Sequence, residues 1–423
     1  MKPIIKTQSI GSWPLAIALL CLLAVSASAQ VLTLDSVLRA VDARNPMLQE
    51  YTFKVKALNT YTNGAKSWMA PMVGAGTFMT PYPGQMIMDE GDKGSFMITV
   101  EQDIPNPAKL NANKNYMASR ASVEEQGRAK QFNILRSEAK NLYYKWLISK
   151  QKMKTLQENE RIIELIVKIS RIRYPYNQGS LGNIYKAEGR LYEVKNMQTM
   201  TLGDIDETRF RLNALMDLPY DTKFEVDTTT QVLFNFNQAV YDTVALSNQR
   251  SDVQQVNKTI DAMRFNQKLQ QAQAKPDFKI RFDHMKSLGE SMPAQFTAMA
   301  MVSIPIAPWS SKMYKSEVQG MQYEIEAMKR GREAILTEAR GMLAGMAAQL
   351  NRMQEQLNTY ETRIIPSLRK NYETLMLAYE ENREQLPIVL DAWETLNMTQ
   401  IQYLEKMEEY YTMIVAYEKE LER

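Results

Sequence analysis

The sequence contains few of the side chains that build catalytic or metal centres. Among its 423 residues there is one cysteine, Cys21, and one histidine, His284. A single cysteine excludes a disulfide within the chain, and a single histidine does not suit a His-based catalytic triad or a zinc site. The sequence also lacks Gly-x-Gly-x-x-Gly, a phosphate loop and His-Glu-x-x-His. We therefore expect a protein that is not an enzyme and has no cofactor.

Long apolar runs and a strong charge of one sign are also missing. Beyond the first 30 residues there is no run of about 20 apolar residues, so we expect no hydrophobic transmembrane helix. The formal net charge is +3, without a concentrated basic segment, and nucleic acid is therefore not an expected partner. The hydrophobic content of 45% is sufficient for a large core.

The first 29 residues have the pattern of a secretory signal peptide. Lys2 and Lys6 precede an apolar stretch at 13–25, and residues 27–29 (Ala-Ser-Ala) provide the small residues of a cleavage site. We place cleavage after residue 29. A short buried helix is the alternative, but length, charge and cleavage pattern together favour a signal peptide.

The only cysteine lies inside this expected signal peptide. A lipoprotein cysteine follows a small residue, whereas Cys21 follows Leu20. We therefore do not expect lipidation. The expected mature chain begins at Gln30 and contains no cysteine at all.

The rest of the chain has the pattern of an internal duplication, in which one unit occurs twice. Each copy has a helix, a pair of strands and a long helical hairpin; the copies occupy 30–230 and 246–423, and 231–245 connects them. The end of each strand pair is similar: Val-Glu-Gln-Asp-Ile-Pro-Asn-Pro-Ala-Lys at 100–109 and Val-Ser-Ile-Pro-Ile-Ala-Pro at 302–308. Such long units exclude tetratricopeptide-like repeats of about 34 residues.

Long helices are predicted in both copies. Asp35 is the expected N-cap of a first helix that Asn45-Pro46 interrupts, and residues 109–174 contain almost no helix breaker. Apolar residues recur at spacings of four and three through 135–167 and again through 389–421. This spacing predicts antiparallel helices packed along a seam.

The second copy contains a further long helix and a further hairpin turn. We expect a helix at 312–365, which Pro366 kinks or resets. The turn of this hairpin is expected near 379–387. The fold class predicted for the whole chain is mainly α, with a small β part and an internal duplication.

Four short strands are predicted between the helices, at 72–79, 95–104, 277–284 and 295–306. Apolar and charged residues alternate in them, which predicts a sheet with two different faces. The expected apolar, lipid-facing residues are Phe96, Ile98, Val100, Phe278, Ile280 and Phe282. The polar residues on the other face, which we expect to face the water-filled lumen of a membrane barrel, are Thr99, Glu101, Lys279, Arg281 and Asp283.

These strands suit a membrane-spanning β-barrel, whose tilted strands have about 9–11 residues, apolar toward lipid and polar toward a water-filled lumen. A four-stranded sheet cannot stand alone in a bilayer, because its edges would leave N–H and C=O groups unpaired. Three copies would close a barrel of 12 strands, and their helices would close a tube below it. An α+β protein without a pore, built around a coiled coil, is the alternative at this point.

The order of these elements resembles the TolC-like outer-membrane efflux protein family over nearly the whole expected mature chain. Four local matches support the resemblance. Residues 102–109 (Gln-Asp-Ile-Pro-Asn-Pro-Ala-Lys) are similar to the strand-to-helix passage of the heavy-metal branch (CzcC/CusC-like). Residues 212–219 (Leu-Asn-Ala-Leu-Met-Asp-Leu-Pro) resemble the end of the first hairpin in this family, and residues 176–179 (Tyr-Asn-Gln-Gly) resemble the tip of that hairpin. Residues 389–392, followed by Gln400 and Tyr403, resemble the start of the last helix.

The resemblance implies a passive, homotrimeric conduit across the outer membrane of a Gram-negative bacterium, with a periplasmic helical extension. It implies outer-membrane lipid, a periplasmic adaptor (membrane fusion protein) and an inner-membrane RND-type pump as partners. Residues 102–109 make heavy-metal cations the first choice of substrate. Drug or organic-molecule efflux and type I protein secretion are the alternatives, and a periplasmic coiled-coil scaffold or adaptor without a pore is the alternative from another class.

Two groups of candidate site residues lie at the hairpin tips. We expect adaptor contacts at Tyr176, Gly179, Tyr379 and Asn382, with turn geometry alone as the alternative. The second tip has Asn382 where the first has Gly179, and asparagine also tolerates a left-handed backbone. Glu380, Glu381 and Glu384 would form acidic rings at the periplasmic mouth of a threefold tube and are a candidate gate, or else a solvated charge run.

Methionine is abundant, with 28 residues. Met79, Met86, Met88 and Met97 lie near the first strand turn, and Met285, Met292, Met299 and Met301 near the second. Thioethers suit Cu(I), but methionine also fills irregular packing, and we assign no metal ligand here. The single histidine, His284, is left open between a lumen position and an interface position.

Overall fold

The computed structural model describes residues 30–177, 179–227, 234, 242–290, 292–305 and 307–422. The expected signal peptide at 1–29 and most of the expected connector at 231–245 lie outside the described residues. Among the described helices, none is long and apolar enough to cross a membrane.

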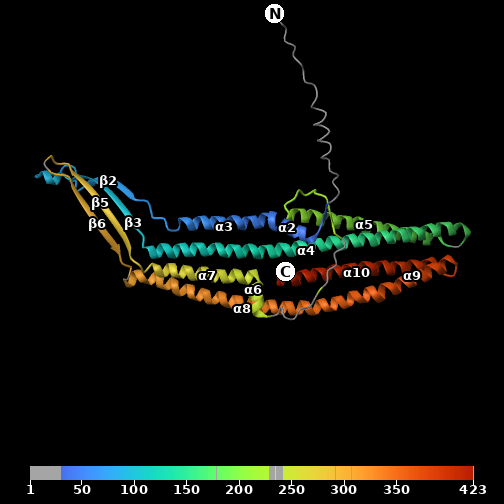
Figure 1. Cartoon of the computed structure of the whole chain (residues 1–423). Coiled ribbons are helices and arrows are strands. Elements are labelled where there is room, and N and C mark those ends of the chain that lie inside the picture. The colour runs from blue at the N-terminus through green and yellow to red at the C-terminus, as the bar shows by residue number, and fades with distance from the viewer. Residues whose placement is uncertain are drawn as a thin grey trace, which may run out of the picture.

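The molecule is a long rod of helices with a small sheet at one end (Figure 1). The helices are α2 (Leu34–Arg44), α3 (Pro46–Gly64), α4 (Pro107–Arg173), α5 (Leu181–Leu215), α6 (Thr243–Gln249), α7 (Ser251–Ala272), α8 (Pro308–Thr359), α9 (Ile365–Glu380) and α10 (Leu386–Glu420). The strands are β1 (Gln30–Leu32), β2 (Met72–Phe78), β3 (Ser95–Ile104), β4 (Phe224–Val226), β5 (Asp277–Ser287) and β6 (Gln295–Ser303). The predicted fold class, mainly helical with a small β part, is confirmed.

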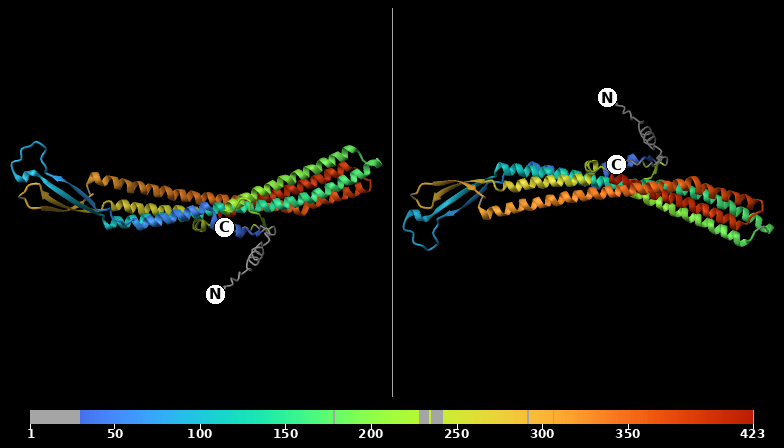
Figure 2. Two further views of the ribbon diagram at one scale, coloured as in Figure 1. Left: turned by 90° about the horizontal axis from the view of Figure 1, so that it is seen from above. Right: turned by 90° about the horizontal axis from the view of Figure 1, so that it is seen from below.

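The helices fall into two halves along the rod. α3, α4, α7 and α8 lead from the sheet to the middle, and α4, α5, α9 and α10 continue to the hairpin tips (Figure 1). Seen from above and below, these helices run along the length of the rod, and the sheet lies at one end only (Figure 2). The tips and the sheet are therefore at opposite ends.

The break predicted at Asn45-Pro46 is present, but the first cap is different from the expected one. Asn45 caps α3 by accepting the N–H of Met47 at 3.0 Å, and its amide donates to the carbonyl of Leu215 at 2.9 Å. α2 is capped by Thr33 and not by Asp35. Thr33 has the extended backbone that a cap requires, whereas Asp35 already lies within the helix.

The long helix predicted at 109–174 is α4, which has 67 residues and is therefore about 100 Å long. Pro107 occupies its first turn, where a missing N–H costs nothing. Its predicted apolar seam is buried: Leu135, Trp146 and Ile163 are all less than 5% exposed. This burial confirms a packed seam along α4.

The helices that follow the two hairpin tips, α5 and α10, share the same backbone pattern. α5 and α10 have 35 residues each. Each of them follows a left-handed asparagine, Asn177 (φ 60°) or Asn382 (φ 57°). Each is followed by a left-handed acidic residue, Asp217 (φ 54°) or Glu422 (φ 55°). Equal lengths and equal turns at both ends indicate the same local fold.

The helix expected at 312–365 begins earlier and is interrupted as predicted. α8 begins at Pro308, and a π-helical turn (Tyr360–Ile364) separates it from α9. Pro366 has no N–H to donate and its ring would crowd the carbonyl four residues earlier. A π-helical turn widens the backbone at such a point.

The four strands form one antiparallel sheet in the order β2-β3-β5-β6. β5 extends beyond the predicted 284 to Ser287, and β6 ends at Ser303, before the predicted 306. β1 and β4 pair in parallel in the middle of the rod. In the described sheet β2 and β6 are the edges.

Candidate channel wall and hairpin tips

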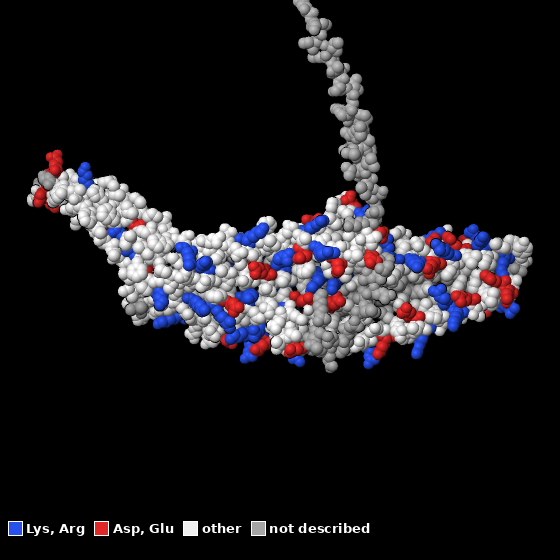
Figure 3. All heavy atoms as spheres, viewed as in Figure 1, with Lys and Arg blue, Asp and Glu red and all other residues white. Residues whose placement is uncertain are grey.

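The sheet has the two faces that the alternation predicted. The register pairs Val100 with Phe282 and Ile104 with Phe278, so that these apolar side chains lie on one face. All the predicted apolar residues are between 40% and 50% exposed: Phe96, Ile98, Val100, Phe278, Ile280 and Phe282. Figure 3 shows Lys, Arg, Asp and Glu interspersed along the helices, whereas the visible surface of the sheet carries few of them. A large apolar surface therefore remains uncovered in one chain.

The predicted polar residues meet on the opposite face. Thr99 Oγ1 donates to Asp283 Oδ1 at 2.7 Å, and Arg281 Nε donates to the same carboxylate oxygen at 2.9 Å. Lys279 Nζ lies 2.5 Å from Glu101 Oε1. Each cation is thus paired with a carboxylate, and the face is polar without a large net charge.

Sequence reasoning missed one member of this charged face and left His284 open. Asp103 Oδ1 lies 3.3 Å from Lys279 Nζ, so this lysine bridges two carboxylates. The alternation along β3 already placed Asp103 with Glu101 and was a usable signal. His284 pairs with Ile98 and Phe296, which places it on the apolar face near the turn end of β5. A position on the charged face is excluded for this histidine.

The edges of the sheet are exposed. Every residue of β2 is exposed, and β6 is nearly as open. Edge strands present unpaired N–H and C=O groups that serve as a template for another strand. The sheet therefore has both an uncovered apolar face and two pairing edges.

The two hairpin tips use the same backbone turn. Asn177 N–H donates to the carbonyl of Tyr174 at 3.1 Å, and Asn382 N–H donates to the carbonyl of Tyr379 at 3.0 Å. The left-handed residue of the first tip is Asn177, and Gly179 is not in that conformation. The expected equivalence of Gly179 and Asn382 was therefore wrong, because in each tip the left-handed residue is an asparagine three residues after the tyrosine that accepts its N–H.

The residues predicted to contact an adaptor differ in accessibility. Tyr176 is 73% exposed, and Gly179 and Asn382 are exposed as well. Tyr379 is only 3% exposed. Its ring is covered by the guanidinium of Arg173, which lies 4.4 Å from the ring centre. In this structure the surface of the second tip is formed by other residues.

Arg173 joins the two tips and was missed from the sequence. Its Nη1 donates to the carbonyl of Tyr379 at 2.6 Å, and its Nη2 donates to the carbonyl of Glu380 at 2.7 Å. A basic residue in the last turn of α4 was a weak signal, because such residues often bind terminal carbonyls. The carbonyls here belong to a different helix, more than 200 residues away in the sequence.

The predicted acidic cluster lies at the surface of the second tip. Glu380 and Glu381 are exposed and Glu384 is half-buried. Glu381 pairs with Arg383 at 2.8 Å, and Glu384 accepts the N–H of Gln385 at 2.9 Å. The three carboxylates are close in sequence but do not share a partner.

A groove of about 520 Å³ lies between the tips, lined by residues from both, among them Ser170, Arg173, Asn183, Tyr379, Glu384 and Leu386. On α9, burial raises the pKa of Tyr372 to about 12, with a smaller contribution from the carboxylates of Glu380 and Glu373. This tyrosine is therefore neutral at all physiological pH values. The groove is polar, and among its described lining residues no nucleophile is paired with a base.

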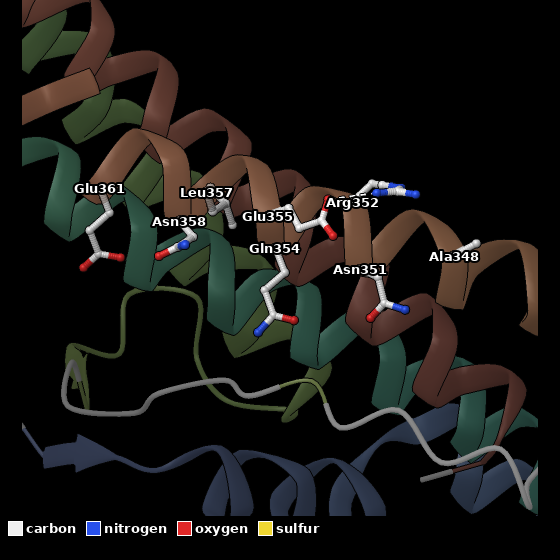
Figure 4. Close-up of a pocket in the computed structure, with 8 residues that line it drawn as sticks. All are labelled: Ala348, Asn351, Arg352, Gln354, Glu355, Leu357, Asn358 and Glu361. Carbon is white, nitrogen blue, oxygen red and sulfur yellow. Dashed lines mark hydrogen bonds and ion pairs between the residues drawn. The ribbon is translucent and has the colours of Figure 1, made fainter. Parts of the chain in front are cut away.

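A hollow of about 830 Å³ lies along α8 (Figure 4). Its lining residues all belong to α8 and the π-helical turn: Ala348, Asn351, Arg352, Gln354, Glu355, Leu357, Asn358 and Glu361. Arg352 and Glu355 pair with each other at 2.9 Å. Over the described ranges, no group of three or more His, Cys, Asp or Glu residues is arranged to hold a metal ion. Nothing in this hollow indicates catalysis.

Comparison with known proteins identifies the class of fold. No family model matches the chain, and no curated protein matches its sequence. Several solved structures do match. The outer-membrane channel OprN is 14% identical in sequence, and the match covers 92% of this chain and 89% of that chain with a TM-score of 0.73. CusC, whose structures are described in terms of transmembrane channel formation, is 14% identical, and the match covers 92% of this chain and 91% of that chain with a TM-score of 0.72. The outer-membrane protein VceC of Vibrio cholerae is 14% identical, and the match covers 92% of this chain and 95% of that chain with a TM-score of 0.70.

These likenesses extend over nearly the whole described chain and nearly the whole of each matched structure. At 14% identity they show the fold alone. The chain therefore has the TolC-like channel fold, in which a small sheet is joined to long helical hairpins.

Proposed function

We propose that the chain is one subunit of a homotrimeric outer-membrane channel in a tripartite efflux system. The observation that carries this proposal is the sheet: four antiparallel strands with an exposed apolar face, a charged opposite face and two open edges. A single copy cannot satisfy those edges in a bilayer. Three copies supply 12 strands and close them into a barrel.

In such a barrel Phe278, Ile280 and Phe282 face lipid, and the paired charges around Lys279 and Asp283 face the lumen. Ion pairs keep the wall polar without a strong field of one sign, so that the lumen stays wet. The channel makes and breaks no covalent bond. The energy for export comes from an inner-membrane RND-type pump, which is joined to the channel by a periplasmic adaptor.

The tips are the proposed place of contact with this adaptor, because they lie at the far end of the rod from the sheet (Figure 1). Tyr176, Gly179 and Asn382 provide accessible surface there. Tyr379 contributes by fixing the second tip against Arg173. Glu380, Glu381 and Glu384 remain our candidate for the acidic periplasmic mouth.

Heavy-metal cations are the proposed substrate, on the similarity of residues 102–109 to the heavy-metal branch. Part of this stretch also has a structural role, since Asn106 caps α4 and Lys109 Nζ lies 2.5 Å from Asp277 Oδ2 at the start of β5. We further propose the outer membrane of a Gram-negative bacterium as the location. Export of organic molecules or of proteins, or a scaffold without a pore, are the competing functions.

The membrane orientation of the sheet can be tested by placing a lysine on each face. Phe282→Lys puts a charge on the proposed lipid face in the middle of β5, and we expect it to destabilise the inserted barrel by roughly 2–4 kcal/mol. Thr297→Lys is the control, because Thr297 pairs with Asp283 on the charged face of the same sheet. The measurement is the amount of folded trimer in the outer-membrane fraction. Normal insertion of Phe282→Lys together with loss of Thr297→Lys would reverse the assignment of the faces.

The substrate is tested by deleting the gene and comparing growth on copper, silver, zinc, cobalt and cadmium salts with growth on dyes, detergents and antibiotics. We expect sensitivity to metal salts that the wild-type gene restores. Sensitivity confined to organic compounds would contradict the metal proposal and leave the channel proposal standing. A protein found free in the periplasm would contradict the channel itself.

A further inference from the structure

The methionines of the sheet all lie on its charged face. By register, Met72 pairs with Glu101, Met299 pairs with Arg281, and Met301 pairs with Lys279. Met97 and Met285 pair with each other. The apolar face of the same described strands carries phenylalanine, isoleucine, valine and alanine, together with Thr77, Gln102, His284 and Lys286, but no methionine. This segregation was not visible in the count of methionines alone.

Hydrophobic packing does not explain this distribution. A methionine selected for its apolar character would be expected among the phenylalanines of the lipid face, where burial in lipid is favourable. On the opposite face its thioether lies beside ion pairs. A thioether sulfur is a soft ligand, and soft ligands prefer Cu(I) and similar ions. Binding of a soft metal ion by the sulfur is therefore the role that methionine can have on this face.

Met97 and Met285 form the one cross-strand methionine pair of the described sheet. Directly opposed residues have their Cβ atoms about 4.5–5.5 Å apart, and each methionine side chain has three rotatable bonds. The two sulfurs can therefore approach one ion together. Beside Met97 in the same row is Gly76, where an added Cβ would have no neighbour within 4 Å. The pair has open space on that side.

The charges around this pair differ from those around the other methionines. The neighbouring rows on the same face contain Thr99 with Asp283, and Ser95 with Ser287, without a lysine or arginine in β3 or β5. Arg281 lies one row further and is held by Asp283 at 2.9 Å. Met299 and Met301, by contrast, are directly opposite Arg281 and Lys279, whose positive groups already occupy the nearby carboxylates.

We propose that Met97 and Met285 form a thioether site for a monovalent soft cation, Cu(I) or Ag(I), on the wall of the channel. This inference rests on the proposed function, because it requires the charged face to be the lumen. Three copies would place three such pairs around the lumen, at the turn end of the sheet. Two neutral ligands bind weakly, and weak binding lets an ion leave as readily as it enters.

The test uses Ag(I) alone as the probe, because it does not change oxidation state. The full-length protein, labelled with ¹³C at its methionine methyl groups, is titrated with silver nitrate in chloride-free detergent solution. We expect the methyl signals of Met97 and Met285 to shift together and to saturate at one ion per chain. Signals of Met299 and Met301 are expected to stay in place.

Single substitutions make the test specific. Met97→Leu keeps the apolar volume and removes one ligand, so we expect loss of the silver-dependent shift of Met285. The matched control is Met299→Leu, on the same face beside Arg281, which is expected to leave that shift unchanged. Absence of a shift at Met97 and Met285 in the wild-type protein, or persistence of the Met285 shift in Met97→Leu, would overturn the site.

Potassium conductance in planar bilayers separates this inference from the proposed function. Met97→Leu is expected to conduct potassium like the wild type, because leucine leaves the wall intact. A conducting channel without silver shifts at the pair would refute the site alone. A protein that is absent from the outer-membrane fraction would refute the proposed channel, and with it the place of the site on a lumen wall.

Discussion

The two hairpin tips share a backbone and differ in almost every side chain. In each, the carbonyl of a tyrosine accepts the N–H of an asparagine three residues later, which takes the left-handed conformation: Tyr174 with Asn177, and Tyr379 with Asn382. Between them stand Pro-Tyr in the first tip and Glu-Glu in the second. The positions that set the turn are the same, and the positions that face outward have diverged.

The environments of the two tips have diverged as well. Tyr174 is 43% exposed, whereas its counterpart Tyr379 is 3% exposed beneath Arg173. Arg173 belongs to the first tip and binds the carbonyls of the second. Identical turns thus serve two purposes: the second tip is anchored on the first, and the first presents its aromatic residues to solvent. Substitutions that alter one tip at a time can separate these two purposes.

The largest difference is expected for the paired tyrosines. Tyr379→Ala removes a buried aromatic ring from the cluster that packs the tips, and we expect it to destabilise the second tip by about 3–5 kcal/mol. Tyr174→Ala is the matched control at the exposed counterpart, with an expected loss below about 1 kcal/mol. Amide hydrogen exchange in α9 and α10 measures the free energy of local opening. Equal losses for the two variants would show that the tips are equivalent after all.

The next effect concerns the turn that the tips share. Asn177→Ala and Asn382→Ala place an alanine in the left-handed region, and we expect each to destabilise its tip by about 1–2 kcal/mol. Replacing either asparagine by glycine should have little effect, because glycine adopts this conformation freely. Gly179→Ala is the second control: it has no left-handed backbone and an added Cβ has no neighbour within 4 Å. The same exchange measurement applies, and a large effect of Gly179→Ala would contradict the assignment of the turn.

The sequence was sufficient for features that depend on neighbouring residues. Strict alternation in β5 predicted both faces of the sheet, and Asn45-Pro46 predicted a helix break, because each pattern acts within a few residues. The exact turn residue at the first tip was misassigned: glycine at 179 is permissive, but the left-handed residue is Asn177, which follows the 3₁₀ turn Tyr174–Tyr176.

Features that depend on distant segments were not predictable in this way. Arg173 and Tyr379 meet only because the two hairpins pack together, and the sequence around either residue does not predict this contact. The exclusive placement of methionine on one face required the register of all four strands. A periodic pattern places a residue on a face, but only the pairing of strands shows which residues share a row.

The smallest effect is expected for the charges of the second tip. Glu380, Glu381 and Glu384 occupy positions whose counterparts in the first tip, Pro175, Tyr176 and Gly179, carry no charge. If the second tip lines the mouth, replacing these glutamates by glutamine lowers the preference of the channel for cations. The reversal potential across a planar bilayer measures this preference, and we expect the change to disappear in 1 M salt, where the Debye length is about 3 Å.

Tyr176→Glu, the reverse change at the first tip, shows which tip lines the mouth. Tyr176 is 73% exposed, so that an added carboxylate would be solvated and should not raise cation preference if only the second tip surrounds the opening. An equal and opposite shift for Tyr176→Glu would place both tips at the mouth. An unchanged reversal potential in the glutamine variants at low salt would mean that the acidic cluster is a solvated surface, because a charge beside a narrow pore cannot be removed without altering the potential that permeating ions experience.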